Sequence, residues 1–331
     1  MTSEPPLLRV ENMVKRFRVP GGVVEAVSGV GFTLRRGQTL GLVGESGCGK
    51  STTGRAVLQL PPPDEGTVRF DGAELTSLSR HDLREVRRRL QIVWQDPRSA
   101  LNPGRRVRDV VAEGLVIAGR PRAEIGERVD AALTEVGLDP AVVADRRPHE
   151  FSGGQCQRVA IARALVLGPE LLICDEPVAS LDVSVQAQVL NLLEDVKARH
   201  GLSLLFISHD LGVVHNVSDR VAVMYLGRIV EIGDVSSVYG APAHPYTRAL
   251  LDSVPVPDPL APAPGPPLTG EVPSPLNPPS GCRFRTRCPM ARPLCAERMP
   301  ELREIGDDHQ VACHFSPESP ESPAFPQGGR P

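Results

Sequence analysis

The 331-residue sequence predicts an α/β fold with a parallel sheet at its centre, and three short strings indicate it. They are G-E-S-G-C-G-K-S at Gly44 to Ser51, F-S-G-G-Q at Phe151 to Gln155 and L-L-I-C-D-E at Leu171 to Glu176. The first joins a short apolar run to helix-forming residues, and the third is an apolar run that ends in two carboxylates. Apolar runs that alternate with helical segments are typical of a parallel sheet covered by helices on both faces.

The first string is typical of a loop that binds nucleotide phosphates. Thr39 to Val43 predicts a strand before it, and Ser51 to Leu60 predicts a helix after it that Pro61 ends. Glycines let backbone N–H groups surround a phosphate, Lys50 reaches the β and γ phosphates, and the Ser51 hydroxyl completes a Mg²⁺ shell. The residues expected to contact ATP here are Gly44, Glu45, Ser46, Gly47, Cys48, Gly49, Lys50, Ser51 and Thr52.

Two carboxylates follow Leu171 to Cys174, a run that predicts a buried strand whose carboxyl end lies beside the phosphate loop. Asp175 is predicted to hold Mg²⁺ through water. Glu176 is predicted to be the general base that polarises the attacking water, a role typically worth about 10²–10⁴-fold in rate.

Polar residues at two further strand ends extend this site. Leu202 to Ile207 is followed by S-H-D, so His209 is expected to sense the γ phosphate from a neighbouring strand tip. Gln95 follows Gln91 to Trp94 and is expected to reach Mg²⁺ and the attacking water. Both assignments depend on the order of the strands. The predicted Mg²⁺ set is Ser51, Gln95 and Asp175.

These motifs, in this order, make the chain similar to the ATP-binding subunit of a bacterial ABC importer of the oligopeptide/dipeptide branch, from about Leu8 to His314. In that family the phosphate loop of one subunit and the F-S-G-G-Q type signature of another close over one ATP. The resemblance implies that Asp182 lies at the dimer seam and that Phe17 stacks on adenine, with a core position as the alternative for Phe17. The signature residues implied to contact the partner's ATP are Ser152, Gly153, Gly154 and Gln155.

Two cysteines stand next to these motifs. Cys48 lies in the phosphate loop, and Cys156 follows the signature, where a basic residue is common in the family. Both lie near predicted helix N-termini, where a thiolate is favoured, so they are candidates for reactive thiols. Small space-filling residues are the alternative interpretation.

Composition fits a cytosolic α/β enzyme with one large core and an appendage. The sequence is 40% hydrophobic, and no apolar run approaches the roughly 18 residues needed to span a bilayer. The N-terminus also lacks the apolar segment of a signal peptide. The net charge of −3 argues against a general nucleic-acid binder. Together with the resemblance, which implies membrane permeases as partners, this leads us to expect a peripheral protein at the cytoplasmic face of the cell membrane, with no nucleic-acid partner.

The first predicted domain is an ABC-type P-loop NTPase core at residues 1–235. It begins with an antiparallel β portion, suggested by Leu8 to Arg18 and Gly66 to Phe70. A helical insert at about 96–165 interrupts it and includes an amphipathic helix at Glu124 to Val136. By resemblance, this insert grips a cytoplasmic helix of the permease.

A Pro/Cys-rich C-terminal extension at residues 236–315 supports the peptide branch. His244 to Leu251 reads H-P-Y-T-R-A-L-L, which is similar to a segment of peptide-importer ATPases just beyond the catalytic core. Val254 to Pro279 holds 11 prolines in 26 residues, which predicts an extended strap, with a disordered linker as the alternative. Residues 316–331 are predicted to be a disordered tail.

Four cysteines close the extension at spacings C-x₅-C-x₆-C-x₁₇-C. Stable disulfides are rare in a reducing cytosol, so clustered thiols in a small segment with little core suggest a metal site. The spacing lacks the C-x₂-C pair usual for zinc, and the resemblance implies a [4Fe–4S] cluster; Zn²⁺ and free structural cysteines are the alternatives. His309 or His314 is an alternative to one thiolate. The predicted ligands are Cys282, Cys288, Cys295 and Cys313.

Two classes of function compete. In the first, the chain hydrolyses ATP to energise import of di- or oligopeptides, together with a second, similar ATPase, two permeases and an extracytoplasmic peptide-binding protein. In the second, it is a soluble ABC ATPase acting on nucleic acid or ribosomes. Such proteins usually carry two cassettes or a long coiled coil, whereas this sequence has one cassette and no sustained heptads, so the first class is favoured. Nickel or another small solute is the alternative cargo, and the family usually pairs two different ATPases.

Overall fold

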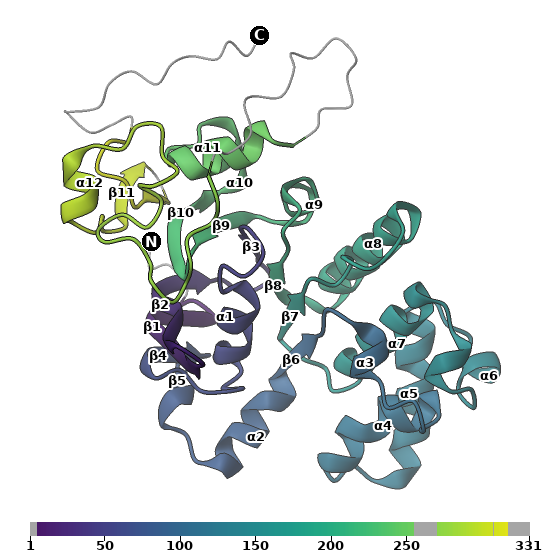
Figure 1. The fold of residues 1–331 in the computed structure, drawn as a ribbon. Helices are drawn as coiled ribbons and strands as arrows, with labels where there is room; N and C mark the ends of the chain where they lie inside the picture. The colour runs from purple at the N-terminus through teal and green to yellow at the C-terminus, as the bar shows by residue number, and fades with distance from the viewer. Residues whose placement is uncertain (1–4, 255–269, 307, 317–331) are drawn as a thin grey trace.

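An eight-stranded sheet forms the centre of the molecule (Figure 1). Its order is β11-β12-β10-β9-β3-β8-β7-β6, and the neighbours from β9 to β6 are parallel. Every residue of β7 and β8 is buried, which explains why both strands are almost entirely apolar. The strands are β3 (Thr39–Val43), β6 (Leu90–Val93), β7 (Leu171–Asp175), β8 (Ser203–Ile207), β9 (Arg220–Tyr225), β10 (Arg228–Asp234), β11 (Arg303–Gly306) and β12 (His309–Val311). This computed structural model describes residues 5–254, 270–306 and 308–316.

A second, four-stranded antiparallel sheet packs beside the first and confirms the predicted β portion. Its order is β2-β1-β4-β5. Val10 and Val30 of this sheet share a buried core with Leu42 of β3 and with Ala56 of the first helix, so that helix lies between the two sheets. The elements are β1 (Leu8–Val19), β2 (Gly22–Leu34), β4 (Glu65–Phe70), β5 (Ala73–Glu74) and α1 (Lys50–Val57).

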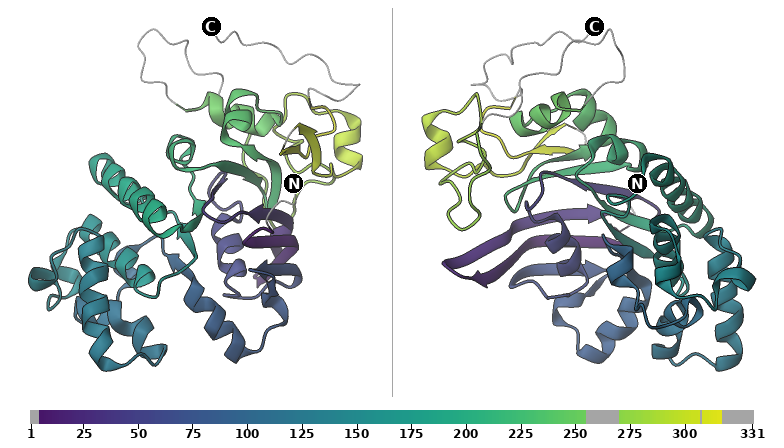
Figure 2. Two further views of the ribbon diagram at one scale, coloured as in Figure 1. Left: turned by 180° about the vertical axis from the view of Figure 1, so that it is seen from behind. Right: turned by 45° about the vertical axis from the view of Figure 1, so that its right-hand side comes forward.

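A cluster of helices between β6 and β7 forms the predicted insert. The expected amphipathic helix is present as α5, which buries Val129 and Leu133. The insert lies at the opposite end of the molecule from the described part of the C-terminal extension, as the views in Figure 2 show. Its helices are α3 (Pro97–Ala100), α4 (Val107–Ile117), α5 (Arg122–Glu135), α6 (Pro140–Val143), the 3₁₀ turn η2 (Pro148–Glu150) and α7 (Gly153–Leu165).

The remaining helices lie outside the insert, in the core and in the C-terminal extension. They are the 3₁₀ turn η1 (Leu75–Ser77), α2 (Arg80–Arg89), α8 (Val183–His200), α9 (Leu211–Val217), α10 (Val235–Gly240), α11 (Pro245–Asp252) and α12 (Pro293–Glu297). In the described part of the chain, no helix combines the length and the apolarity needed to cross a membrane.

The C-terminal extension joins the core through the buried carboxylate of Glu231 on β10. It accepts hydrogen bonds from the backbone N–H groups of Ala243 (2.7 Å) and His244 (2.9 Å), and His309 Nε2 on β12 lies 2.8 Å from it. Pairing of β12 with β10 extends the sheet into the extension. Most of the predicted strap, residues 255–269, and most of the predicted tail, residues 317–331, lie outside the described residues.

Candidate active site

The strand order places the predicted catalytic motifs along one edge of the parallel sheet. β3 leads into the phosphate loop, and β8, β7 and β6 follow as successive parallel neighbours. The segments that carry His209, Glu176 and Gln95 leave the carboxyl ends of these three strands. The assignments of His209 and Gln95 required their strands to be neighbours of β7, and β8 and β6 do lie on either side of it.

The phosphate loop has the close backbone packing that its glycines permit. Gly44 and Gly49 have φ values of 151° and 108°, and a Cβ on either would lie 2.1 Å from a backbone oxygen of Met224 or Ala26. The buried ammonium of Lys50 donates to the carbonyls of Gly44 (2.8 Å) and Glu45 (3.0 Å). The loop therefore holds a positive charge at the N-terminus of α1, which fits a bound phosphate.

Ser51 and Asp175 come together as predicted for a Mg²⁺ site. The Ser51 hydroxyl donates to Asp175 Oδ1 at 2.5 Å, and Arg55 lies 3.4 Å from Asp175 Oδ2. Arg55 was not predicted, although its position four residues after Ser51 places it on the same face of α1. Carboxylate and hydroxyl oxygens are ligands that Mg²⁺ accepts, so these residues fit the ion.

Glu176 is contacted by both other predicted catalytic residues. Gln95 Nε2 donates to Glu176 Oε2 at 2.9 Å, and His209 Nδ1 lies 3.3 Å from the same oxygen. The Glu176 side chain is 12% exposed and its φ of 48° is in the left-handed region, which is unusual for a residue other than glycine. The backbone thus directs this carboxylate away from the strand and toward Gln95 and His209.

Phe17 lies on β1 and is 37% exposed, so the alternative of a core position is not the observed one. Lys15 Nζ lies 5.7 Å from the centre of its ring. An exposed ring can stack on a base, and adenine stacking by Phe17 stays a prediction.

The signature begins helix α7 with two reciprocal hydrogen bonds. Ser152 Oγ accepts from the Gln155 N–H (3.3 Å), and Gln155 Oε1 accepts from the Ser152 N–H (3.0 Å). Gly154 packs closely on α8, because a Cβ there would lie 2.5 Å from Val185. Asp182 and Val183 at the start of α8 are exposed, Val183 to 82%. The signature and Asp182 therefore lie close together, with Ser152, Gln155 and Asp182 exposed.

Cys48 and Cys156 are not the reactive thiols that their positions near helix N-termini suggest. Both side chains are buried, and burial raises the pKa of each thiol above its usual value. The structure favours the alternative interpretation, in which both are small space-filling residues.

The H-P-Y-T segment reaches the phosphate loop, a contact that the sequence did not predict. His244 Nδ1 accepts from the Tyr246 N–H at 3.0 Å and so begins α11. Burial lowers the pKa of His244 to about 4, which keeps the ring neutral. The Tyr246 hydroxyl accepts from the Glu45 N–H at 2.9 Å. Arg287 also pairs with Glu45, and no spacing rule links position 45 to position 246 or 287.

The four C-terminal cysteines line one cavity of about 20 Å³, together with Phe284 and His314. Burial, and to a smaller extent the neighbouring thiols, raise the pKa of Cys288 to about 12 and of Cys313 to about 11. Among the described residues, no group of three or more His, Cys, Asp or Glu side chains has a metal-binding arrangement. His309 pairs with Glu231, so it is not an alternative ligand in this arrangement. The four thiols line the same cavity, but they are not arranged as the ligands of a metal ion.

The chain matches two known families and several curated proteins. The family described as "ABC transporter" matches residues 27–179, and "Oligopeptide/dipeptide transporter, C-terminal region" matches residues 230–295. A "Putative peptide import ATP-binding protein" of Brucella ovis is 50% identical over 312 residues, which is 94% of this chain and 98% of the relative. "Oligopeptide transport ATP-binding protein OppF" of Escherichia coli is 52% identical over 308 residues, which is 90% of each chain.

Solved structures share the cassette. CbiO1 of Clostridium perfringens, described as part of the ABC transporter complex cbiONQ, has a TM-score of 0.64 and 32% identity over 72% of this chain and 92% of its own. The dimeric cassette MJ0796 bound to ADP and Pi has a TM-score of 0.63 and 26% identity over 69% of this chain and 98% of its own. With half of the residues identical to relatives over almost its whole length, the chain belongs to the ABC transporter ATPases, in the branch that carries the oligopeptide/dipeptide transporter C-terminal region.

Proposed function

We propose that this chain is the ATP-hydrolysing subunit of an ABC importer for di- and oligopeptides. The observation that carries the proposal is the convergence of Gln95 and His209 on Glu176 beside the phosphate loop. The C-terminal family match and the names of the relatives support peptides as the cargo class.

Hydrolysis follows from the residues at the sheet edge. Lys50 exchanges its two loop carbonyls for the β and γ phosphates of ATP. Glu176 accepts a proton from the attacking water, while Gln95 and His209 orient the water and contact the γ phosphate. Ser51, Asp175 and Gln95 are the residues that would hold Mg²⁺, and the bound ion would neutralise charge on the phosphates.

The proposed working unit is a dimer. The exposed start of α7 presents Ser152 and its following glycines to an ATP on the partner subunit's phosphate loop, and Asp182 lies beside it at the seam. By family resemblance, the partner is a second, different ATPase. Closure on two ATPs and reopening after hydrolysis supply the motion that the permeases use.

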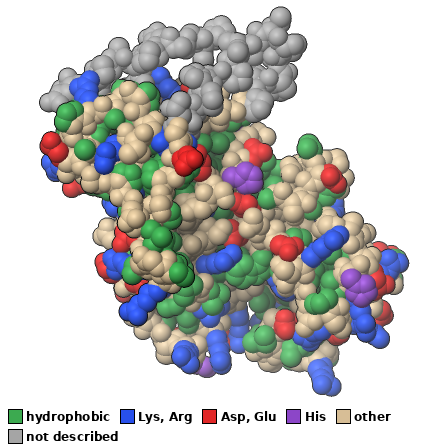
Figure 3. Space-filling model, viewed as in Figure 1, with side chains coloured by type: hydrophobic (Ala, Val, Ile, Leu, Met, Phe, Trp, Pro, Cys, Tyr) green, Lys and Arg blue, Asp and Glu red, His purple; other side chains and the backbone are tan. Residues whose placement is uncertain are grey.

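A hollow between the core and the helical insert is the proposed permease site. Side chains of α2, α4 and α5 line a cavity of about 370 Å³, and Figure 3 shows basic side chains around a hollow between these two parts. Val116 and Ile117 at the end of α4 are 60% and 76% exposed. A permease helix docked here would hold the chain at the cytoplasmic face of the membrane. Hydrolysis is thus assigned to residues 1–235, docking to the insert at 96–165 and support of the site to residues 236–315.

Purification of the tagged chain from membranes tests this proposal. We expect two permeases and a second ATPase to co-purify. After reconstitution into lipid vesicles, the complex should take up labelled peptides when the peptide-binding protein is supplied. Ile117→Asp should lose the permeases and keep ATP binding, because it places a charge on the exposed apolar end of α4, next to the cavity-lining residue Ala118. Val142→Asp, at a 51% exposed residue of the same insert, is the matched control and should keep them. Recovery of ribosomal proteins alone, or uptake of nickel instead of peptides, would contradict the proposal.

We further propose that the four C-terminal cysteines hold a [4Fe–4S] cluster. Four thiols around one cavity are the donor set of such a cluster, and loading it would require them to rearrange, because they do not form a ready site. The cysteines would fix the extension against the core, as a structural role.

Anaerobic purification of the full chain tests the metal. We expect a brown protein with about four irons per chain. Cys288→Ser should lose the colour and the iron, whereas Cys174→Ser, at a buried cysteine of β7 outside the cavity, should keep both. If the protein is colourless and contains one zinc per chain, the cysteines bind Zn²⁺ and not an iron–sulfur cluster.

A further inference from the structure

The segment between the first two cysteines of the extension, residues 282–288, lies against the phosphate loop. Its Arg287 side chain is only 5% exposed and forms a two-point ion pair with Glu45, from Nη1 to Oε2 at 2.7 Å and from Nη2 to Oε1 at 3.0 Å. Paired, planar contacts of this kind fix the position of a carboxylate as well as its charge. Arg287 therefore determines where the second residue of the phosphate loop lies.

Aromatic side chains beneath the loop fix Arg287 in turn. Its guanidinium lies 5.9 Å from the centre of the Tyr225 ring, and Phe284 packs against Tyr225 and Tyr246 at centre distances of 5.3 and 5.4 Å. The Tyr246 hydroxyl accepts a hydrogen bond from the backbone N–H of Glu45. The extension thus holds both the side chain and the backbone of Glu45.

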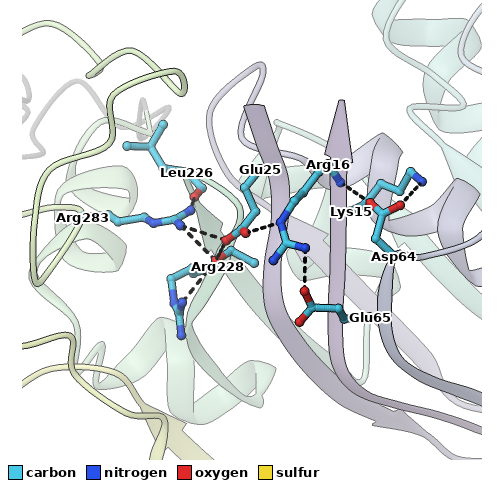
Figure 4. A network of polar contacts seen from close by, with 9 residues as sticks. Lys15, Arg16, Glu25, Asp64, Glu65, Leu226, Arg228 and Arg283 are labelled. Atoms are coloured by element: carbon cyan, nitrogen blue, oxygen red, sulfur yellow. Dashed lines mark hydrogen bonds and ion pairs between the residues drawn. The ribbon is translucent and has the colours of Figure 1, made fainter. Parts of the chain in front are cut away.

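Arg283 of the same segment reaches the strands on the other side of the loop. Its guanidinium donates to Ser28 Oγ at 2.9 Å and to the Leu226 carbonyl, and it lies 3.5 Å from Glu25 (Figure 4). Glu25 also accepts from Arg16 Nε at 3.0 Å, next to Phe17 on β1. The segment therefore contacts both the phosphate loop and the strand pair that carries the predicted adenine contact.

Arg285 lies between these two arginines and provides a comparison. Its side chain donates to the Ser280 carbonyl at 2.9 Å and to Ser280 Oγ at 3.3 Å, so the contacts described for it stay within the extension. Arg287 thus contacts the phosphate loop and Arg283 contacts β2, whereas Arg285 contacts its own segment.

We propose that Arg287 is a positioning residue for ATP: the cysteine-bracketed segment 282–288 sets nucleotide affinity by holding Glu45 in the phosphate loop. This inference rests on the proposed ATP site. Cys288, which lines the cysteine cavity, follows Arg287 directly, so this support borders that cavity. The extension is thereby a determinant of ATP binding in addition to its link to the core.

Equilibrium binding of MgATP to the full-length chain tests the proposal. We expect Arg287→Gln to weaken binding about tenfold and Arg285→Gln to change it less than about twofold. Glu45→Gln should weaken binding by a similar factor, and the double variant should bind no more weakly than either single variant, because the two residues act as one pair. Arg287→Lys, which keeps the charge but not the two-point contact, should lie between wild type and Arg287→Gln.

Steady-state hydrolysis by the co-purified complex separates positioning from folding. A positioning role raises KM for ATP and leaves kcat within about twofold, whereas loss of folded protein lowers kcat at unchanged KM. Arg287→Gln with the affinity and KM of Arg285→Gln, or additive effects in the double variant, would overturn this inference alone. Absence of ATP binding by the wild-type chain would instead overturn the proposed function.

Discussion

Glu176→Gln should bind ATP with nearly unchanged affinity and hydrolyse it about 10²–10⁴ times more slowly than wild type. The amide keeps the shape of the side chain and its contacts with Gln95 and His209, but it cannot accept the proton of the attacking water. Because ATP then persists, the dimer should accumulate in its closed form. Phosphate release gives the rate, and size-exclusion chromatography with MgATP gives the dimer.

Glu194→Gln is the matched control for this variant. Glu194 is a partly buried glutamate on α8 that has no role in the proposed site, and burial raises the pKa of its carboxyl. It should hydrolyse ATP at the wild-type rate. Near-normal hydrolysis by Glu176→Gln would show that Glu176 is not the general base.

Lys50→Ala should lose ATP binding itself, by at least about 100-fold. The ammonium is buried among the loop carbonyls, so an alanine there removes the charge that would contact the β and γ phosphates. Equilibrium binding distinguishes this variant from Glu176→Gln, which is expected to bind and not to turn over.

Lys197→Ala supplies the control, since the sequence has only three lysines and Lys197 lies on α8, where it pairs with Asp219. Removal of this ion pair should leave ATP affinity within about twofold of wild type. Tight ATP binding by Lys50→Ala would show that the phosphates lie elsewhere.

The sequence predicted this edge of the sheet well, because each motif follows an apolar run that itself indicates a strand. An apolar run that ends in Asp175 and Glu176 predicts a buried strand with carboxylates at its tip, and both are present. The assignments of Gln95 and His209 depended on the order of the strands, which the pattern of residues along the chain does not give. Their meeting at Glu176 is a product of topology.

Other features depend on burial and on distant contacts, which local patterns do not encode. Position near a helix N-terminus favoured a reactive Cys48, but desolvation outweighs that effect and raises the pKa of the thiol. The ion pair of Arg287 with Glu45 spans 242 positions of sequence. Cysteine spacing predicted that four thiols gather, and they do line one cavity, but spacing alone did not fix their ligand geometry.

A shorter version of this chain that ended at Gly240 would strip Glu231 of all three of its hydrogen-bonding partners. A fully buried carboxylate without donors costs several kcal/mol, so in such a protein the end of β10 would have to open to water. A truncation at Gly240 should therefore lower the free energy of unfolding of the protein, because the extension supplies the donors that keep this acid in the interior.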